Sequence, residues 1–246
     1  MVRELGPGVY RLADDIVNSY LVVDGTDVTV VDAGVPGYWS ALPPALGDIG
    51  RRMEDVRAVI LTHGHSDHLG FAEFARRRRI DVGIHELDAP LAMGKVPNPA
   101  RGYGPVRVRS LLGFLWWTTL HGGLRAQWLG DVATFGDGVF LDVPGSPRVI
   151  HVPGHTPGSV AYHFRSHGAL FVGDAFATYA VTTGAHGPRL APFTADRAAA
   201  LESLDRLGDV DAALVLPGHG PEWRDGPAAA IEAVRAATSG ARPPQA

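Results

Sequence analysis

Four side chains that can bind a metal ion lie within six residues of one another. His63, His65, Asp67 and His68 belong to the run Thr-His-Gly-His-Ser-Asp-His-Leu-Gly at residues 62–70. Imidazole and carboxylate ligands in combination suit zinc, iron, manganese or nickel. A lone histidine here would most simply be a solvated loop residue. Four such residues in one short run instead predict a metal-binding loop.

This loop follows an apolar run and precedes a helical pattern. Residues 58–61, Ala-Val-Ile-Leu, predict a buried strand. Apolar side chains then recur at helical spacing, at Leu69, Phe71, Phe74 and Ala75. The ligand-type residues are therefore expected on a strand-to-helix turn, where their side chains can converge on one point. The basic run 76–79 is expected to end the helix, where positive charge complements the helix dipole.

Three later segments share one design, in which an apolar strand ends at a glycine followed by a histidine or an aspartate. These are Gly-His at 154–155, Gly-Asp at 173–174 and Gly-His at 218–219. Glycine allows the backbone to turn tightly or to approach another group closely. Strand ends that meet at one edge of a sheet can direct these side chains towards the metal-binding loop. A structural role explains any one of them, but less readily all three in this order.

The arrangement resembles the metallo-β-lactamase superfamily. The signature His-x-His-x-Asp-His of that superfamily is matched at residues 63–68, and the three later segments match its remaining metal motifs. The resemblance runs from about residue 8 to about residue 222. It implies an α/β fold, a four-layer αββα sandwich of two mixed β-sheets with helices outside and metals at one edge.

The resemblance also implies a ligand for each metal position of the two-metal members. Transferred by position, the first metal would be held by His63, His65 and His155, and the second by Asp67, His68 and His219, with Asp174 bridging them. Two divalent metal ions are therefore expected as cofactors, with zinc expected before iron or manganese.

The implied chemistry is hydrolysis by a hydroxide bridged by two metal ions, with Asp67 accepting its proton. One metal would polarise a carbonyl oxygen, and the other would hold the leaving group. Tyr179, His186 and Arg189, on the stretch after Asp174, are candidate substrate contacts. The predicted enzyme is a dinuclear metal-dependent hydrolase that cleaves a small ester, lactone or thioester.

Other functions remain open beside this hydrolase. A mononuclear iron oxidoreductase of the persulfide dioxygenase type would use only His63, His155 and Asp174. A β-lactam hydrolase and a non-catalytic binding protein on the same scaffold are further alternatives. The complete second-site ligand set favours the two-metal hydrolase.

Departures from known branches of the superfamily narrow the choice. The chain has no cysteine, which some lactamases carry at the second metal. Only 27 residues follow His219, too few for the C-terminal helical domain of glyoxalase II. Acyl-homoserine lactonases have a tyrosine three residues after the bridging aspartate, where this chain has Ala177 and where Tyr179 is the nearest substitute. The expected position is in a dinuclear branch similar to glyoxalase II and the lactonases.

The elements that must position these residues follow from hydrophobic patterns. We expect a hairpin at 8–12 and 16–23, strands at 27–32, 81–85, 148–152, 159–164, 169–172 and 212–216, and helices at 36–50, 86–93, 195–207 and 228–237. One domain is expected over 1–239, with a disordered tail at 240–246. Asp32, at a strand end, could cap the next turn or support the metal-binding loop from behind. Of the remaining histidines only His186 is kept as a site candidate, and the others are assigned structural roles: His85, His121, His151, His163 and His167.

The segment 94–130 is the irregular part of the chain. Large apolar side chains recur every four residues, the spacing of one helix face, at Leu112, Trp116, Leu120, Leu124 and Trp128. A core-packing helix pair is the first interpretation. A lid over the metal site, in which Trp116 contacts the substrate, and a dimer contact are the alternatives.

Composition limits the partners. The net charge is −4 and the basic run 76–79 has no interleaved aromatic residues, so no nucleic-acid partner is expected. The N-terminus has no apolar signal core, and the apolar stretch 111–120 is too short to span a bilayer. We therefore expect a cytoplasmic protein without a membrane partner, monomeric or homodimeric, that acts on a small molecule.

Overall fold

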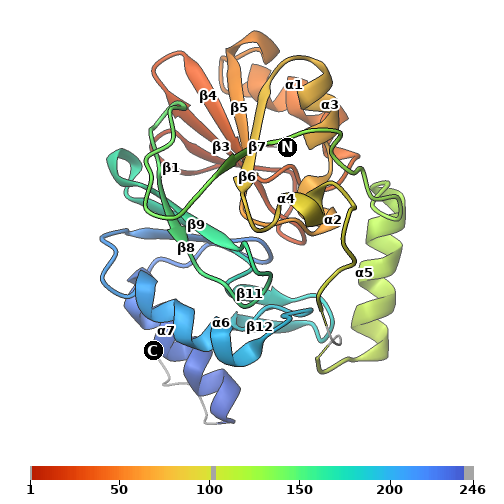
Figure 1. The fold of residues 1–246 in the computed structure, drawn as a ribbon, viewed down its shortest axis with the longest axis vertical. Helices are drawn as coiled ribbons and strands as arrows, with labels where there is room; N and C mark the ends of the chain where they lie inside the picture. Colours follow the sequence, from red (N-terminus) through yellow and green to blue (C-terminus); the bar gives the residue numbers. More distant parts are fainter. Residues whose placement is uncertain (1, 101–103, 241–246) are drawn as a thin grey trace.

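The strands of the first half of the chain form one seven-stranded sheet (Figure 1). The computed structural model describes residues 2–100 and 104–240. The strands lie in sequence order: β1 (Val2–Gly6), β2 (Val9–Leu12), β3 (Ser19–Asp24), β4 (Asp27–Val31), β5 (Val56–Leu61), β6 (Asp81–His85) and β7 (Ala133–Phe135). Pairing is antiparallel from β1 to β4 and parallel from β4 to β7, so the sheet is mixed.

A four-stranded sheet contains most of the second half. Its spatial order is β13 (Leu214–Pro217), β10 (Ala169–Gly173), β9 (Val160–Phe164) and β8 (Arg148–His151). Strand β10 pairs parallel with β13 and antiparallel with β9, so this sheet is also mixed. A separate hairpin, β11 (Ala177–Ala180) and β12 (Ala185–Arg189), follows β10.

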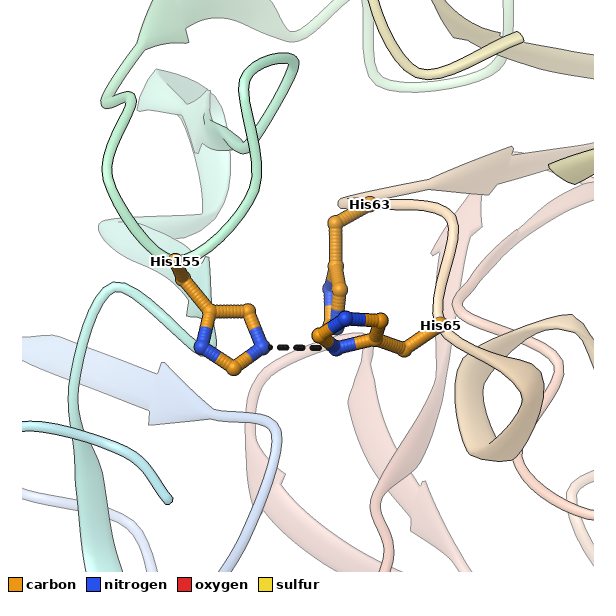
Figure 2. A group of neighbouring side chains, drawn as sticks. All are labelled: His63, His65 and His155. Carbon is orange, nitrogen blue, oxygen red and sulfur yellow. Dashed lines mark hydrogen bonds between the residues drawn. The ribbon is translucent and has the colours of Figure 1, made fainter. Parts of the chain in front are cut away.

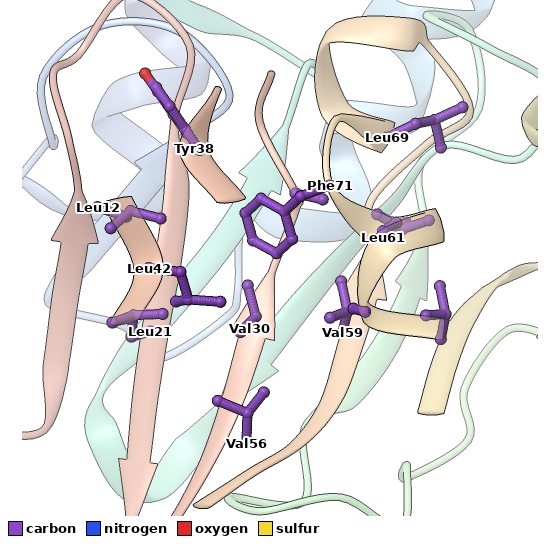
Figure 3. Close-up of a cluster of buried hydrophobic side chains, with 14 of the residues drawn as sticks. Leu12, Leu21, Val30, Tyr38, Leu42, Val56, Val59, Leu61, Leu69 and Phe71 are labelled. Atoms are coloured by element: carbon purple, nitrogen blue, oxygen red, sulfur yellow. The ribbon is translucent and has the colours of Figure 1, made fainter. Parts of the chain in front are cut away.

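Three clusters of buried side chains define four layers, because neighbouring residues on a strand point to opposite faces of a sheet. Val30 and Val59 pack against Tyr38 and Phe71, which belong to the region of helices α1 (Tyr38–Asp48) and α3 (Ala72–Arg77) (Figure 3). Val31 and Ile60, the next residues on the same two strands, point into the space between the sheets, where they meet Phe171 of the second sheet. Helices α6 (Arg197–Ser203) and α7 (Gly226–Ser239) cover the other face of that sheet. The predicted αββα sandwich of two mixed sheets is confirmed.

The remaining helices are short or peripheral. They are α2 (Ser66–Leu69), α4 (Ala89–Ala92), α5 (Val108–Leu120) and the 3₁₀ turns Met53–Asp55, Arg165–His167 and Leu204–Leu207. The predicted strand-to-helix turn around the metal-binding loop is confirmed by β5, α2 and α3. Within the described part of the chain, no helix is long and apolar enough to cross a membrane. The predicted tail at 240–246 lies outside the described residues, except for Gly240.

Four strands were missed by the hydrophobic pattern. Strand β1 exposes two charged residues, Arg3 and Glu4, among its five, and β7 has only three residues. The hairpin of β11 and β12 contains glycine and proline and shows no clear alternation of apolar residues. These strands form because neighbouring elements offer backbone partners, and that information is absent from their local sequence.

The interpretation of 94–130 as a core-packing helix pair is wrong. Among the described residues of this segment, α5 is the only helix, and none of the residues of Val108–Leu120 is buried. The predicted apolar face is exposed, with Trp116 66% and Leu112 60% accessible. The opposite face of α5 contacts the body of the protein, so the four-residue spacing found a real helix face but assigned it to the wrong side.

Candidate metal centre

Four loops bring the seven predicted ligands to one edge of the two sheets. Residues 62–70 follow β5 of the first sheet, and residues 152–159 follow β8 of the second. Asp174 and His219 come directly after β10 and two residues after β13 respectively. The centre therefore straddles both sheets, and its formation requires the complete sandwich. All of the predicted ligands are brought together: His63, His65, Asp67, His68, His155, Asp174 and His219.

Three histidines form the first group (Figure 2). Nε2 of His155 lies 2.9 Å from Nδ1 of His65, and the ring of His63 lies 4.7 Å from that of His155 between centroids. The ligand atoms of the three lie within 4.8 Å of one another. All three side chains are buried. This is the spacing expected of three imidazoles around one ion.

A second group contains Asp67, His68 and His219, and Asp174 lies between the two groups. Nε2 of His219 lies 3.5 Å from Oδ2 of Asp67 and 3.3 Å from Oδ2 of Asp174. The same Asp174 carboxylate lies 3.4 Å from Nε2 of His155 and 3.7 Å from Nε2 of His68. Asp174 thus contacts both groups, which is the position of a bridging ligand.

Asp32 fixes the orientation of two of these histidines. Its Oδ1 accepts a hydrogen bond from the Thr62 backbone N–H (2.7 Å), and its Oδ2 accepts from the Thr62 hydroxyl (2.8 Å). Oδ2 also lies 3.0 Å from Nδ1 of His68. Because the Thr62 hydrogen is already donated to Asp32, its oxygen accepts from Nδ1 of His63 at 3.0 Å. The supporting role considered for Asp32 is confirmed.

The other three histidines are oriented by separate loops. The Thr194 hydroxyl donates to the carbonyl of Ala191, so at 3.2 Å it accepts from Nδ1 of His155. Nε2 of His65 donates to Oδ1 of Asn98 at 3.1 Å. Nδ1 of His219 donates to the backbone carbonyl of Ile16, in the loop before β3. Each imidazole therefore has one ring nitrogen bonded outwards and its other nitrogen directed at the centre.

The pKa values of the buried histidines shift in opposite directions in the two groups. Burial, with a smaller contribution from neighbouring imidazoles, holds the pKa of His63 well below its usual value. Burial also lowers the pKa of His65 and of His155. These three imidazoles are neutral at neutral pH, which is the form that coordinates a metal.

At the second group the carboxylates outweigh burial. Burial lowers the pKa of His68, but the opposite effect of Asp32 and Asp174 is larger, so the pKa is raised to about 10. The pKa of His219 is also raised, because Asp174 outweighs burial there. The pKa of Asp174 is held well below its usual value by His219, His68 and His155 against the effect of burial. A cation that binds here must displace protons from His68 and His219, so its affinity rises with pH.

Unpaired buried atoms provide the test of whether these residues fit a metal. Nε2 of His63, Nε2 of His68 and Oδ1 of Asp174 are buried and have no hydrogen-bond partner within residues 2–100 and 104–240. A buried polar atom without a partner is costly. All three point into the same space, and nitrogen and carboxylate donors suit a divalent ion. The residues present therefore fit metal ions.

The four candidate substrate contacts are placed differently. Arg189 is half-buried and lines a cavity beside the centre. Tyr179 and His186 pair across β11 and β12, with their rings 5.0 Å apart, and His186 is exposed. Trp116 lies on the exposed face of α5. On the opposite face, Phe114 lies with its ring 6.5 Å from that of His219, edge to face.

Asp88 is a residue of the centre that sequence reasoning missed. Its side chain is fully buried and accepts hydrogen bonds from the N–H of Gly64 (2.8 Å), the hydroxyl of Thr156 (2.6 Å) and the N–H of Gly158 (2.6 Å). It thereby joins the loop of His63 and His65 to the loop of His155. A carboxylate inside the predicted short helix 86–93 was its only sequence signal.

Comparison with known proteins agrees with the fold. Residues 12–219 match the Metallo-beta-lactamase superfamily. A probable metallo-hydrolase of Bacillus subtilis, YflN, is 30% identical over 88% of this chain and 85% of its own length. The fold is similar to the metallo-beta-lactamase family protein TTHA1429 of Thermus thermophilus, with a TM-score of 0.70 and 28% identity over 96% of this chain and 81% of that one. TTHA1623, solved in a di-iron-bound form, has a TM-score of 0.58 and 29% identity over 87% of this chain and 92% of that one.

A sandwich of two mixed sheets with a histidine and aspartate cluster at one edge defines a metallo-hydrolase fold. The chain belongs to the metallo-β-lactamase superfamily.

Proposed function

We propose that the chain is a hydrolase that binds two divalent metal ions and cleaves a small ester, lactone or thioester. The observation that carries the proposal is the convergence of five imidazole nitrogens and the Asp174 carboxylate on one buried space. Two overlapping groups share this carboxylate, as expected of a site for two ions rather than one. Zinc is our first choice of metal.

Bound in these groups, two divalent ions would activate a water molecule and polarise a carbonyl oxygen. The chain's own residues hold the site rigid and move protons. Asp32, Thr62 and Thr194 fix the histidines. Asp67 is the most accessible of the ligands, with 28% of its side chain exposed, and is the group placed to accept a proton. The buried Asp174 would offset the repulsion between two cations held in these groups.

Relatives support the two parts of this proposal separately. The name of YflN describes a probable metallo-hydrolase. TTHA1623 has been observed with two iron ions. The iron in that relative keeps iron as an alternative metal for this chain. A placement near the glyoxalase II and lactonase-like branch, and a small-molecule substrate, are part of the same proposal.

A substrate panel tests the proposed reaction. Metal-loaded protein is assayed with an aryl ester, a lactone, an acyl thioester, a phosphodiester, a cephalosporin and an alkyl persulfide. We expect a carboxylic ester, lactone or thioester to be cleaved fastest. Asp174→Asn should lose about 100-fold or more of this activity, and Asp142→Asn, at an exposed acid distant from the ligand set, should retain it. Oxygen consumption with the persulfide, without ester cleavage, would show a dioxygenase instead.

A further inference from the structure

A cavity of about 800 Å³ lies beside the metal centre. Its walls come from the hairpin β11–β12, the loop 190–195, and the ends of α5 and α7 nearest to them. In Figure 1 the hairpin lies in the lower part of the view, between α7 and the lower end of α5 and away from α1 and α3 at the top. None of the seven candidate ligands lines it, so the cavity is a second compartment and not the metal centre itself.

The charge in this cavity is positive and uncompensated. Arg107, Arg189 and Arg197 line it, and its described lining contains no aspartate or glutamate. None of the three guanidinium groups lies within 4.0 Å of a carboxylate oxygen in residues 2–100 and 104–240. Other arginines, such as Arg76 and Arg206, do pair with carboxylates. The lining arginines are therefore available to an anion from outside.

Arg189 is held ready for such a contact. It is half-buried, and its guanidinium donates to the backbone carbonyls of Gly187 and His186, which fixes its direction. Burial lowers its pKa, which shows that part of its hydration has been lost without a counter-charge to replace it. Thr182 and Thr183, which carry hydroxyl groups, belong to the same lining. Arginine and hydroxyl donors together suit a carboxylate or a phosphate.

The cavity and the metal centre share a wall. Thr194 lines the cavity, and its hydroxyl accepts from Nδ1 of His155, whose other nitrogen faces the centre. Arg189 pairs across the hairpin with Ala177, three residues after Asp174. Thr194 and the ring of His155 thus lie between the cavity and the centre.

From this geometry we infer that the cavity binds a carboxylate or phosphate group and that the molecule cleaved at the metal centre carries that group. The inference rests on the proposed hydrolase function for its second half only. Binding of an anion in the cavity does not depend on hydrolysis. The anion could also be a free one, and the experiment separates these two sources.

The first arm compares two esters of equal length. An aryl hemisuccinate ends in a carboxylate, and the matching aryl 4-oxopentanoate ends in a neutral methyl ketone. We expect the wild-type enzyme to prefer the hemisuccinate by about 10-fold or more in kcat/KM, the range of a charge-assisted hydrogen bond. Arg189→Met should reduce this preference about 10-fold, through KM. Arg197 is exposed, so Arg197→Met should not disturb folding. This variant should also reduce the preference for the hemisuccinate. Arg148→Met, an exposed arginine on β8 outside the cavity, should leave both rates unchanged.

The second arm measures binding of succinate and inorganic phosphate to the metal-loaded protein by calorimetry. Binding that weakens at least about fivefold in Arg189→Met and Arg197→Met but not in Arg148→Met supports the cavity as an anion site. Such binding without an ester preference would assign the site to a free anion and overturn the substrate half. Anion binding that all three variants retain would come from the metals, and would overturn the proposal as a whole. If the metal-loaded wild-type protein binds the anion in the cavity but hydrolyses neither ester, the proposed function is refuted and the anion site stands.

Discussion

At the scale of single residues, Gly218 shows how closely the second metal group is packed. A Cβ at this position would overlap Oδ1 of Asp174 and lie 2.6 Å from Cε1 of His68. We predict that Gly218→Ala lowers the affinity for the second metal by roughly 10- to 100-fold. Displacing a ligand carboxylate should cost at least as much affinity as removing a hydrogen-bond partner of a ligand. Competition with a chromophoric chelator measures this affinity.

The matched control is Gly47→Ala in α1. No atom would lie within 4 Å of the added Cβ, and the residue is helical and exposed. Alanine there should leave metal affinity unchanged and stabilise the fold by about 0.5–1 kcal/mol. Equal metal affinities in the two variants would mean that Asp174 and His68 do not form a metal group.

Asp88 carries the second prediction at this scale. Asp88→Ala leaves the donors of Gly64, Thr156 and Gly158 without an acceptor in a buried place. We expect the free energy of unfolding to fall by about 3 kcal/mol or more in urea titrations. First-site metal affinity should fall as well, because the two loops that supply its ligands are no longer joined. A variant that loses stability but keeps full metal affinity would restrict Asp88 to a folding role.

At the scale of elements, α5 crosses the molecule beside the metal centre and is fixed at three points. The N–H of Arg107 bonds Thr182, the indole of Trp117 bonds Asp14, and the carbonyl of His121 accepts from Gly37, each at 2.9 Å. These contacts hold one face of the helix towards the body of the protein and leave the other exposed. The inner face, which includes Phe114, is therefore the part of α5 that faces the site.

We predict that Phe114→Ala lowers kcat/KM for a hexanoyl aryl ester more than for the acetyl ester. Each methylene that loses a buried contact costs about 0.8 kcal/mol, or roughly fourfold in rate. Trp116→Ala, on the exposed face, should change both esters equally or not at all. Steady-state kinetics with the two esters decides the matter. The reverse pattern would show that α5 turns its other face to the substrate.

Helix α3 depends on a charged contact whose pH dependence can be derived. Two hydrogen bonds from Arg76, with further donors from Gly130 and Arg77, lower the pKa of Glu73 from 4.5 to about 2. A folded-state pKa below the unfolded one stabilises the protein fully above about pH 4.5, and this contribution disappears as pH falls towards 2.

Glu73→Gln should therefore cost on the order of 2 kcal/mol at pH 7 and much less near pH 3. Chemical unfolding at both pH values measures the difference, with Glu54→Gln, an exposed acid, as the control. A cost that stays constant from pH 7 to pH 3 would refute the contribution of charge at this position.

At the scale of the whole molecule, the resemblance carried by the motifs implied the sandwich and the seven candidate ligand positions. The residues themselves predicted only that ligand-type side chains at the ends of apolar strands meet at one edge of a sheet. The hydrogen-bond partners Asn98 and Thr194 could not be predicted, because they come from loops that only the folded chain brings near. The role of Asp32 was left between two alternatives for the same reason. The exposed face of α5 was misassigned because periodicity identifies a helix face but does not say which way it turns.

The central claim is that two metal ions are bound and that both are required. Its most direct test is metal content, measured by plasma mass spectrometry on protein grown with ample zinc, iron and manganese, together with ester hydrolysis during stepwise reloading of chelator-treated protein. The account predicts about two metal ions per chain, and activity that continues to rise up to the second equivalent. Saturation at one iron per chain, with full activity and no further gain on adding metal, would contradict it.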